Sequence, residues 1–334
     1  MQDKILLAHG SGGRLSHELV NQLLVARLGN AWLNRMDDSA ILDCTGKLAF
    51  STDSYVVSPR FFPGGDIGRL AVCGTVNDLS MMGAKPLFLS LAFILEEGLP
   101  MSDFEAIIES IHEAANQAEI KIVTGDTKVV EHGKADGIFI NTAGIGVIAP
   151  GVNISGNNAA SGDAIILSGT IADHGVTIMS QREGLKFTGE LLSDCAPLNG
   201  LVADMISVCP SLHVLRDPTR GGLATTLNEI AGQSKAGIRI TESNIPIRPS
   251  VKSLCELLGL DPLFVANEGK LLAVLPEEYA ARLVAVMRLH PYGADAAIIG
   301  SIVSDHPGRV VLHTDFGTSR IIPMMSGDLL PRIC

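Results

Sequence analysis

Aspartates recur in the first part of the sequence at points where apolar segments begin, end or are interrupted. Asp38 lies in MDDSAIL, Asp53 in STDSYVV, Asp78 in VNDLSMMGA and Asp126 in TGDTKVV. Mg²⁺ binds through a few carboxylates together with phosphate oxygens, so a dispersed set of this kind is typical of a magnesium–phosphate site. Aspartate is also common in turns and caps, which is the simpler explanation for any single one. It explains the set less well, because Asp53 and Asp78 interrupt apolar stretches, where a charge needs a partner.

Two further charged groups have the spacing of reactive residues. Lys128 follows Asp126 by two positions, so on an extended segment both side chains point to one face, where they can hold a phosphate or form a surface salt bridge. Glu268, in VANEGKLLAVL, stands between apolar stretches and is a candidate general base. In LRDPTRGG, Asp217 and Arg220 precede a glycine pair, which indicates an anion-binding helix start or a tight domain contact.

A small-residue loop near the beginning of the sequence is a candidate phosphate loop. Its residues are His9, Gly10, Ser11, Gly12 and Gly13, followed by the helix-like run LSHELVNQLLVARL. Such a loop brings backbone N–H groups to phosphate oxygens at a helix N-terminus. The GK[ST] of a Walker A sequence is missing, and a plain flexible N-terminus is the alternative.

The six cysteines divide into five ordinary ones and one exception. None forms a CxxC pair, so a zinc or redox motif is not expected, and five are predicted to be small core residues. Cys334 is the last residue, in PRIC, where burial is hard to achieve. Exposed free cysteines are usually avoided, so a function for this thiol is favoured over chance.

Length and charge limit the class of protein. A chain of 334 residues is expected to form two domains. The net charge of −11 argues against nucleic acid or an anionic membrane as the main partner. Neither a signal peptide nor a membrane-spanning run is recognised, so we expect a cytoplasmic protein.

Apolar periodicity predicts the elements that must position these residues. In the first half the expected strands are 47–57, 86–96, 120–126 and 138–148, and the expected helices are 66–84 and 102–118. The first helix is predicted to end at Gly83, and the second to open with a Ser102–Glu105 capping box. Residues 149–163 are turn-rich and mark a domain junction.

The second half repeats this style without a clear internal repeat. Helices are predicted at 196–208, 221–235 and 277–289, and strands at 237–241, 270–275, 296–303 and 309–314. Residues 324–334 have turn residues and no periodicity, and are predicted to form a mobile tail.

These stretches occur together and in this order in one known family. The chain resembles, over its whole length, the carbamoyl dehydratase (HypE) family of nickel–iron hydrogenase maturation. The similar stretches are HGSGGR, STDSYVVSPRFFPGGDIGRLAVCGTVNDLSMMGAKP, LAFILEEGLP, VTGDTKVV, DPTRGG, NEGK and PRIC. NDLSMMGA also resembles the wider superfamily of aminoimidazole-ribotide synthase, thiamine-phosphate kinase and selenophosphate synthetase. The terminal PRIC narrows the resemblance to one family.

The resemblance implies the fold and the domain limits. It implies an α/β (α+β), two-domain AIR synthase (PurM)-like fold, whose N-terminal domains pair into a β-barrel across a homodimer. Residues 1–150 would form the ATP-binding and dimerisation domain and 160–325 the C-terminal α/β domain. Residues 326–334 would form a flexible tail carrying Cys334.

The resemblance also implies a reaction and its partners. The carbamoyltransferase HypF would place a carboxamide on the Cys334 sulfur, and ATP would then be used to remove the elements of water. The resulting thiocyanate would donate cyanide to iron on a HypC–HypD complex.

Residue roles follow from the resemblance position by position. Cys334 would carry the substrate, and Glu268 and Lys128 would act beside it. The His9–Gly13 loop would cover the phosphates, with Asp53, Asn77, Asp78 and Asp126 also binding ATP. The four aspartates Asp38, Asp53, Asp78 and Asp126 would bind magnesium.

Two other functions remain open from the residues alone. The first is a small-molecule enzyme of the same superfamily, of the selenophosphate synthetase or thiamine-phosphate kinase type, which needs no terminal cysteine. The second is a non-enzymatic carrier with Cys334 as an attachment point, against which the dispersed aspartates argue.

Overall fold

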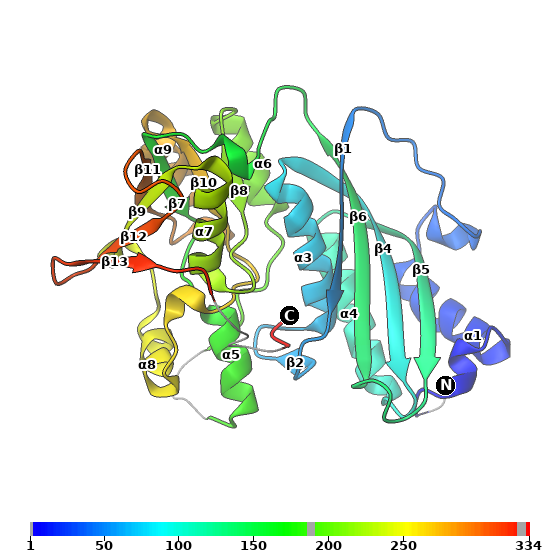
Figure 1. Ribbon diagram of the computed structural model, residues 1–334. Helices are drawn as coiled ribbons and strands as arrows, with labels where there is room; N and C mark the ends of the chain where they lie inside the picture. The colour runs from blue at the N-terminus through cyan, green and yellow to red at the C-terminus, as the bar shows by residue number, and fades with distance from the viewer. Residues whose placement is uncertain (1–2, 186–190, 326–331) are drawn as a thin grey trace.

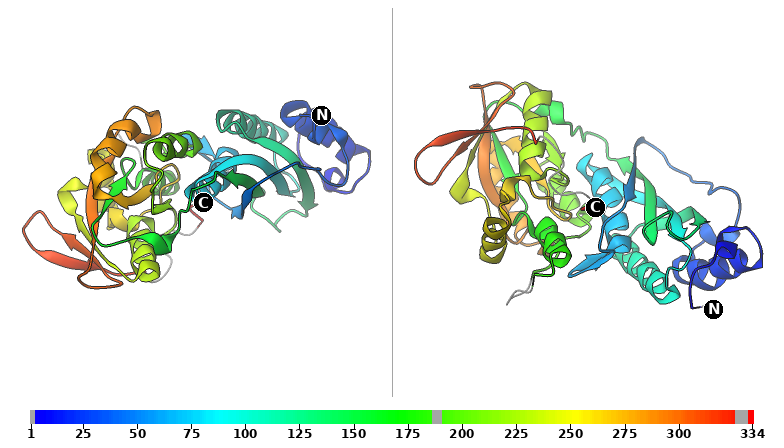
Figure 2. Two further views of the ribbon diagram at one scale, coloured as in Figure 1. Left: turned by 90° about the horizontal axis from the view of Figure 1, so that it is seen from above. Right: turned by 60° about the horizontal axis from the view of Figure 1, so that its bottom comes forward.

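The computed structural model describes residues 3–185, 191–325 and 332–334. It has two α/β domains side by side, and Cys334 lies between them in every view (Figures 1 and 2). In the part of the chain described, no helix is long and apolar enough to cross a bilayer. The predicted domain limits 1–150 and 160–325 remain predictions, and most of the predicted tail lies outside the described residues.

The first domain is built on a four-stranded sheet with the order β1-β6-β4-β5. All four strands were predicted, and their bounds are β1 Lys47–Tyr55, β4 Ala84–Glu96, β5 Lys121–Val130 and β6 Ile138–Ile148. β6 pairs antiparallel with both β1 and β4, whereas β4 and β5 are parallel. The sheet therefore has β1 at one edge and β5 at the other.

Two helices cover one face of this sheet (Figure 1). α3 spans Ile67–Met81, and the Asp66 carboxylate caps it by accepting from the N–H groups of Gly68 and Arg69. The chain leaves α3 through Gly83 in the left-handed region, as predicted. α4 spans Met101–Gln117 and follows an extended Pro100 with no side-chain cap, so the predicted Ser102 capping box is wrong. Ser102 lies inside the first turn, because the helix begins one residue earlier.

The opposite face of the sheet keeps apolar side chains in water. Phe50 is 71% exposed, Leu48 48% and Ile94 46%. Along their strands these residues alternate with side chains that are buried or half-buried, as they must on a sheet with one covered face.

The N-terminal segment lies along the β5 edge of the sheet (Figure 1). It consists of short helical pieces that together form the predicted helix-like run with its flanks. Their bounds are η1 Leu7–Gly10, α1 Arg14–Leu19, the π-helical η2 Val20–Val25, α2 Ala26–Leu28 and η3 Leu33–Arg35. A two-stranded ribbon, β2 Phe61–Phe62 with β3 Gly65–Asp66, leads into α3.

The second domain is built on a seven-stranded sheet with the order β13-β12-β9-β11-β7-β10-β8. The strands are β7 Asp163–Leu167, β8 Val214–Arg216, β9 Gly237–Thr241, β10 Leu272–Pro276, β11 Ala297–Val303, β12 Val310–His313 and β13 Ser319–Ile322. Its helices are α5 Asp173–Arg182, α6 Asn199–Val208, α7 Gly222–Ser234, α8 Pro249–Leu258 and α9 Glu277–Met287. Short 3-10 turns are η4 Gly156–Asn158, η5 Glu242–Asn244, η6 Pro262–Phe264 and η7 Pro291–Gly293. α6, α7 and α9 were predicted, as were β9 to β12, whereas α5 and α8 were missed.

One apolar core joins the two domains. It contains Leu70 of α3 and Ile107 of α4 together with Val176 of α5 and Val251 of α8. Ile333, near the end of the chain, belongs to the same cluster and is 2% exposed. The junction between the domains is therefore packed like an interior, and the tip of the chain is part of it.

Candidate functional site

The predicted site residues fall into two groups at opposite edges of the first sheet. Asp126 and Lys128 are on the edge strand β5, and Asp53 is on the other edge strand, β1. β4 and β6 separate them. Asp78, Glu268 and Cys334 belong with Asp53 at the domain junction, as the contacts below show.

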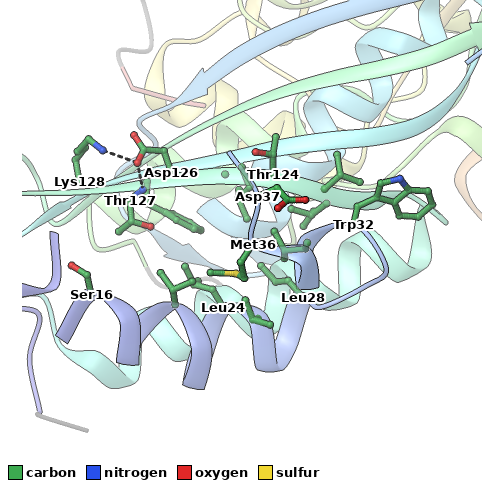
Figure 3. A pocket seen from close by; sticks show the side chains of 18 of the residues that line it. Ser16, Leu24, Leu28, Trp32, Met36, Asp37, Thr124, Asp126, Thr127 and Lys128 are labelled. Carbon is green, nitrogen blue, oxygen red and sulfur yellow. Dashed lines mark hydrogen bonds and ion pairs between the residues drawn. The ribbon is translucent and has the colours of Figure 1, made fainter. Parts of the chain in front are cut away.

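A cavity of about 360 Å³ opens between the N-terminal segment and β5 (Figure 3). Its floor is apolar, and it includes Leu24, Leu28, Trp32 and Phe93. Its polar residues include Ser16, Thr124, Asp126, Thr127 and Lys128. An apolar floor with a few convergent polar groups has the character of a site for a flat, mostly apolar ring with a charged extension.

The Asp126–Lys128 pair stands at this cavity in open solvent. The Lys128 Nζ donates to Asp126 Oδ1 at 2.6 Å, and both side chains are more than half exposed, at 64% and 59%. The two residues share a face of β5, as the spacing predicted. The hydrogen bond from Lys128 lowers the pKa of Asp126. An exposed pair of this kind contributes little to folding, about 0–1 kcal/mol.

The small-residue loop packs against β5 rather than standing free. A Cβ on Gly10 would lie 2.6 Å from the main-chain nitrogen of Val129, so only glycine fits there. Ser16 Oγ donates to the His9 carbonyl at 2.6 Å and accepts from the Gly12 N–H at 3.0 Å. His9, Gly10 and Gly12 line the cavity, and Ser11 and Gly13 are outside its lining. Phosphate binding by the loop stays a prediction.

Asp38 lies apart from the other aspartates. It lines a separate, shallow hollow with Ser39, Phe50, Phe88 and Ser90. Its neighbour Asp37 lines the β5 cavity instead. A metal-binding role for Asp38 stays a prediction.

Carboxylates gather at the domain junction. Ser51 Oγ donates to Asp78 Oδ2 at 2.6 Å. Burial raises the pKa of Asp78, and the negative charge of Asp53 raises it further. Asp217, which begins DPTRGG, also lies here, and burial with the charge of Asp78 raises its pKa to about 7. Neighbouring carboxylates repel one another when both are ionised, so a positive charge bound between them is stabilised.

This junction fits a divalent cation only in part. Within residues 3–185, 191–325 and 332–334, no three His, Cys, Asp or Glu side chains form a metal-holding group. Asp53 and Asp78 can supply a partial set of oxygen ligands. Mg²⁺ usually keeps several waters and completes its shell with phosphate oxygens, so such a partial set suits it.

Asn77 ties the first domain to the second. Its Nδ2 donates to the carbonyl oxygens of Ala196 at 3.0 Å and Glu268 at 3.4 Å, and its Oδ1 accepts from the Leu198 N–H at 2.8 Å. The side chain is 2% exposed. In this arrangement its amide positions the Glu268 segment, and a direct ATP contact remains a prediction.

Glu268 is buried with an unsatisfied carboxylate oxygen. It is 5% exposed, and its Oε1 has no hydrogen-bond partner. Its main-chain N–H donates to Asp194 Oδ1 at 3.1 Å, and a Cβ on Gly269 would lie 1.7 Å from the Asp194 carbonyl oxygen. Burial, followed by the charges of Asp194 and Asp217, raises the pKa of Glu268 well above its usual range. A buried carboxyl oxygen with no partner among the described residues requires an explanation, and a catalytic role is one.

Cys334 lies within electrostatic range of this carboxylate. Burial raises the pKa of its thiol, the charge of Glu268 raises it further, and Arg220 opposes that effect. The main-chain oxygen of Cys334 accepts from the Val56 N–H at 3.1 Å. The sequence predicted a flexible tail that carries this thiol. In the structure the buried Ile333 and the backbone partners of residues 332–334 hold the tip in the junction, and the flexibility of the tail stays a prediction.

Several residues of the junction had no functional signal in the sequence. Asp194 follows a segment without periodicity, and His174 and Arg182 lie on the unpredicted helix α5. Asp217 and Arg220 were predicted to form an anion-binding helix start or a tight domain contact, without a role beside Cys334. Their grouping depends on contacts between segments that are distant in sequence, which spacing cannot reveal.

Comparisons with known proteins agree with this architecture. The AIR synthase related protein N-terminal domain matches residues 36–148, and the corresponding C-terminal domain matches residues 160–313. A carbamoyl dehydratase HypE of Azotobacter vinelandii is 54% identical over 329 residues, which are 98% of this chain and 96% of that protein.

Solved structures show the same similarity. The hydrogenase maturation protein HypE in complex with ATP matches with a TM-score of 0.96 at 53% identity, covering 98% of this chain and 99% of that one. A chain of a HypE–HypF complex matches with a TM-score of 0.81 at 50% identity, over 91% and 99% of the two chains. A thiamine-monophosphate kinase of Stenotrophomonas maltophilia, at 22% identity and a TM-score of 0.68 over 90% and 96%, shares the fold alone.

Proposed function

This chain belongs to the carbamoyl dehydratase HypE family, and on that premise we propose that the Cys334 thiol carries the group on which the enzyme acts. Its activity is ATP-dependent carbamoyl dehydration in hydrogenase maturation. The observation that carries the proposal is the buried Oε1 of Glu268, which has no partner among the described residues and lies within electrostatic range of the Cys334 thiol. A carboxamide on that sulfur would bring N–H donors to this unsatisfied acceptor.

The proposed reaction starts from the S-carboxamide of Cys334. Its oxygen attacks the γ-phosphorus of ATP and ADP leaves, so the carboxamide oxygen becomes part of a phosphate leaving group. Glu268 accepts an N–H proton, and departure of the phosphate with loss of the second N–H proton forms S–C≡N. The balance is one carboxamide and one ATP consumed, and one thiocyanate, one ADP and one phosphate formed.

The surroundings of these residues are suited to the roles proposed for them. The raised pKa of Glu268 makes its ionised form a strong proton acceptor. Asp53 and Asp78 would hold magnesium, which supplies charge neutralisation at the phosphates when bound. Lys128 would stabilise the charge of the γ-phosphoryl group. The apolar floor of the β5 cavity would receive the base of the nucleotide.

The separation of the two groups supports a homodimer. Lys128 is at the β5 edge and Cys334 is beside β1, so one chain holds them apart. The apolar side chains on the uncovered face, including Phe50 and Ile94, need a partner surface. A barrel formed from two copies would bury this face, cover the edge strands, and bring the partner subunit's Lys128 toward Cys334.

Two further partners complete the proposal. HypF would transfer the carboxamide to Cys334, since a relative forms a HypE–HypF complex. The thiocyanate carbon would then pass as cyanide to iron on a HypC–HypD complex.

An intact-mass experiment tests the proposed function. The protein is incubated with HypF, carbamoyl phosphate and ATP, and the mass of the chain is followed. We expect gain of a carboxamide at Cys334 and then loss of one water, with neither change in Cys334→Ala. Both mass changes in Cys334→Ala would overturn the proposal. Cys255→Ala, at a buried cysteine on α8, is the matched control and should behave as wild type.

A further inference from the structure

The tip of the chain lies along residues 56–58 and is held there by main-chain hydrogen bonds, with Arg332 in the left-handed backbone region. The Val56 N–H donates to the Cys334 main-chain oxygen at 3.1 Å, and the Ser58 N–H donates to the Arg332 carbonyl at 3.3 Å. Arg332 Nε returns a bond to the Val56 carbonyl at 2.9 Å. Recognition of an extended peptide by main-chain bonds accepts many sequences, so selectivity must come from side-chain contacts.

Helix α5 of the second domain holds the same tip from the other side. His174 Nε2 donates to the Ile333 carbonyl at 2.8 Å, and Arg182 Nη2 donates to the Arg332 carbonyl. Arg182 Nε also donates to the Ser58 carbonyl at 2.6 Å. The carbonyls of residues 332–334 therefore all have donors, and these donors come from both domains.

The His174 ring is set up as a donor to the tail. Burial lowers its pKa, so the ring is neutral and has one N–H. The Ile333 carbonyl can only accept, so that proton is on Nε2, and Nδ1 accepts from Ser193 Oγ at 2.8 Å. Phe62 packs edge-on against the ring, with centroids 5.4 Å apart, and restricts its rotation.

Residues 193–195 connect the tail to the Glu268 segment. Ser193 Oγ donates to His174 and also accepts from the Cys195 N–H at 3.1 Å. Asp194 Oδ1 accepts from the Glu268 N–H at 3.1 Å. His174, which holds the tail, and Glu268 are therefore both bonded to one short segment.

We propose that His174 and Arg182 are positioning residues that seat the tail through the Ile333 and Arg332 carbonyls and thereby aim the Cys334 sulfur at Glu268. Selectivity comes from Ile333, which is 2% exposed in the joint core, and from the 2.6 Å ion pair between Arg332 and Asp136. The proposal rests on the function of Cys334 proposed above, but tail seating itself can be measured without turnover.

The test combines a seating readout with a rate. Seating is read from the rate at which iodoacetamide alkylates Cys334 in the resting protein, followed by peptide mass analysis. Turnover is read as the single-turnover dehydration rate after carbamoylation. In His174→Phe we expect alkylation to be about tenfold faster and dehydration about tenfold slower, as for loss of a buried hydrogen bond. Carbamoylation by HypF should be unchanged or faster.

Conservative variants separate seating from general stability. His174→Gln keeps a donor near the Nε2 position and should recover most of both rates. Arg182→Lys keeps the charge but loses the paired carbonyl bonds, and should resemble His174→Phe. His313→Phe, on β12 of the same domain, is the matched control and should behave as wild type.

The outcomes distinguish this inference from the proposed function. Wild-type alkylation and dehydration rates in both His174→Phe and Arg182→Lys would overturn the seating role. If these variants accelerate alkylation but wild-type Cys334 never gains a carboxamide, seating stands and the proposed function fails. If His174→Phe does not fold, Arg182→Lys and His174→Gln decide the question by the same two rates.

Discussion

The domain junction and the β5 cavity use the same residue types in opposite ways. At the junction, burial raises the pKa values of Asp78, Asp217 and Glu268, and the carboxylates disfavour one another's charge. At the cavity, Asp126 is exposed beside Lys128, and its pKa is lowered. Residues of the same type therefore have different pKa values in the two regions, because exposure to water decides which protonation state is favoured.

The contrast matches two different tasks. A nucleotide has to enter and leave, so a cavity at an outer sheet edge with a solvated ion pair suits it. In the proposed reaction the base has to be shielded from water, and Glu268 is buried where the two domains pack together. The four predictions below test this contrast, starting with the largest expected effect.

The base at the junction should matter most. In Glu268→Gln we expect the dehydration rate to fall by about 10²- to 10⁴-fold, because general-base catalysis contributes about that factor. Carbamoylation by HypF should continue, and the chain should accumulate with the carboxamide mass. Glu278→Gln, on the exposed side of α9, is the control. Normal dehydration in Glu268→Gln would remove this residue from the mechanism.

A mixing experiment tests whether the two groups meet across a dimer. Asp53→Asn and Lys128→Ala homodimers should each lose about 10²-fold in dehydration rate, as for loss of an electrostatic contact in a transition state. When the two variants are unfolded together and refolded as a mixture, half of the dimers are mixed, each with one intact composite site. Activity should recover to about a quarter of wild type. No recovery would show that each site is built from one chain.

Asp217 should make stability depend on pH at the junction. Its folded pKa, about 7, is above its unfolded value, so its contribution is present below the unfolded pKa and is lost as pH rises to about 7. The shift in pKa corresponds to a loss of at most about 4 kcal/mol in the free energy of unfolding. The real loss is smaller than this limit, because water reaches part of the Asp217 side chain and screens its charge. Urea unfolding at pH 5 and pH 7.5 should show that Asp217→Asn gains stability at the higher pH. If the free energy of unfolding of Asp217→Asn differed from that of the wild type by the same amount at both pH values, this prediction would be contradicted.

Asp126 should show the opposite sign and the smallest effect. Its pKa is lowered, so its contribution is present above the unfolded pKa and is lost as pH falls. Because the pair with Lys128 is solvated, Asp126→Asn should change the free energy of unfolding by less than about 1 kcal/mol at pH 7.5. The same urea series measures it. A loss as large as the effect at Asp217 would mean that the cavity is not the open region described here.

Much of the fold was predictable from local patterns. The strands of the first sheet and helices α3, α6, α7 and α9 have clear apolar periodicity or glycine boundaries. α5 was missed because its buried face contains Asp173, His174 and Thr177, which a periodicity search reads as polar. The Ser102 capping box was wrong because a matching pattern does not say which residue begins the helix.

The candidate site was predicted as a set of residues rather than as an arrangement. Asp53, Asp78, Asp126, Lys128, Glu268 and Cys334 were all named from the sequence. Spacing could not divide them between two sheet edges, nor place Asp38 apart, since strand order depends on pairing between distant segments.

The sequence by itself determined the types of reactive group and the family to which they belong. It also supplied glycine at positions 10 and 269, where the folded chain leaves no room for a side chain. The tertiary structure alone decided that Glu268 is buried and unpaired, and that the end of the chain is held between α5 and residues 56–58. The reason is physical: burial and hydrogen bonding depend on which distant segments exclude water together, and no local pattern encodes that.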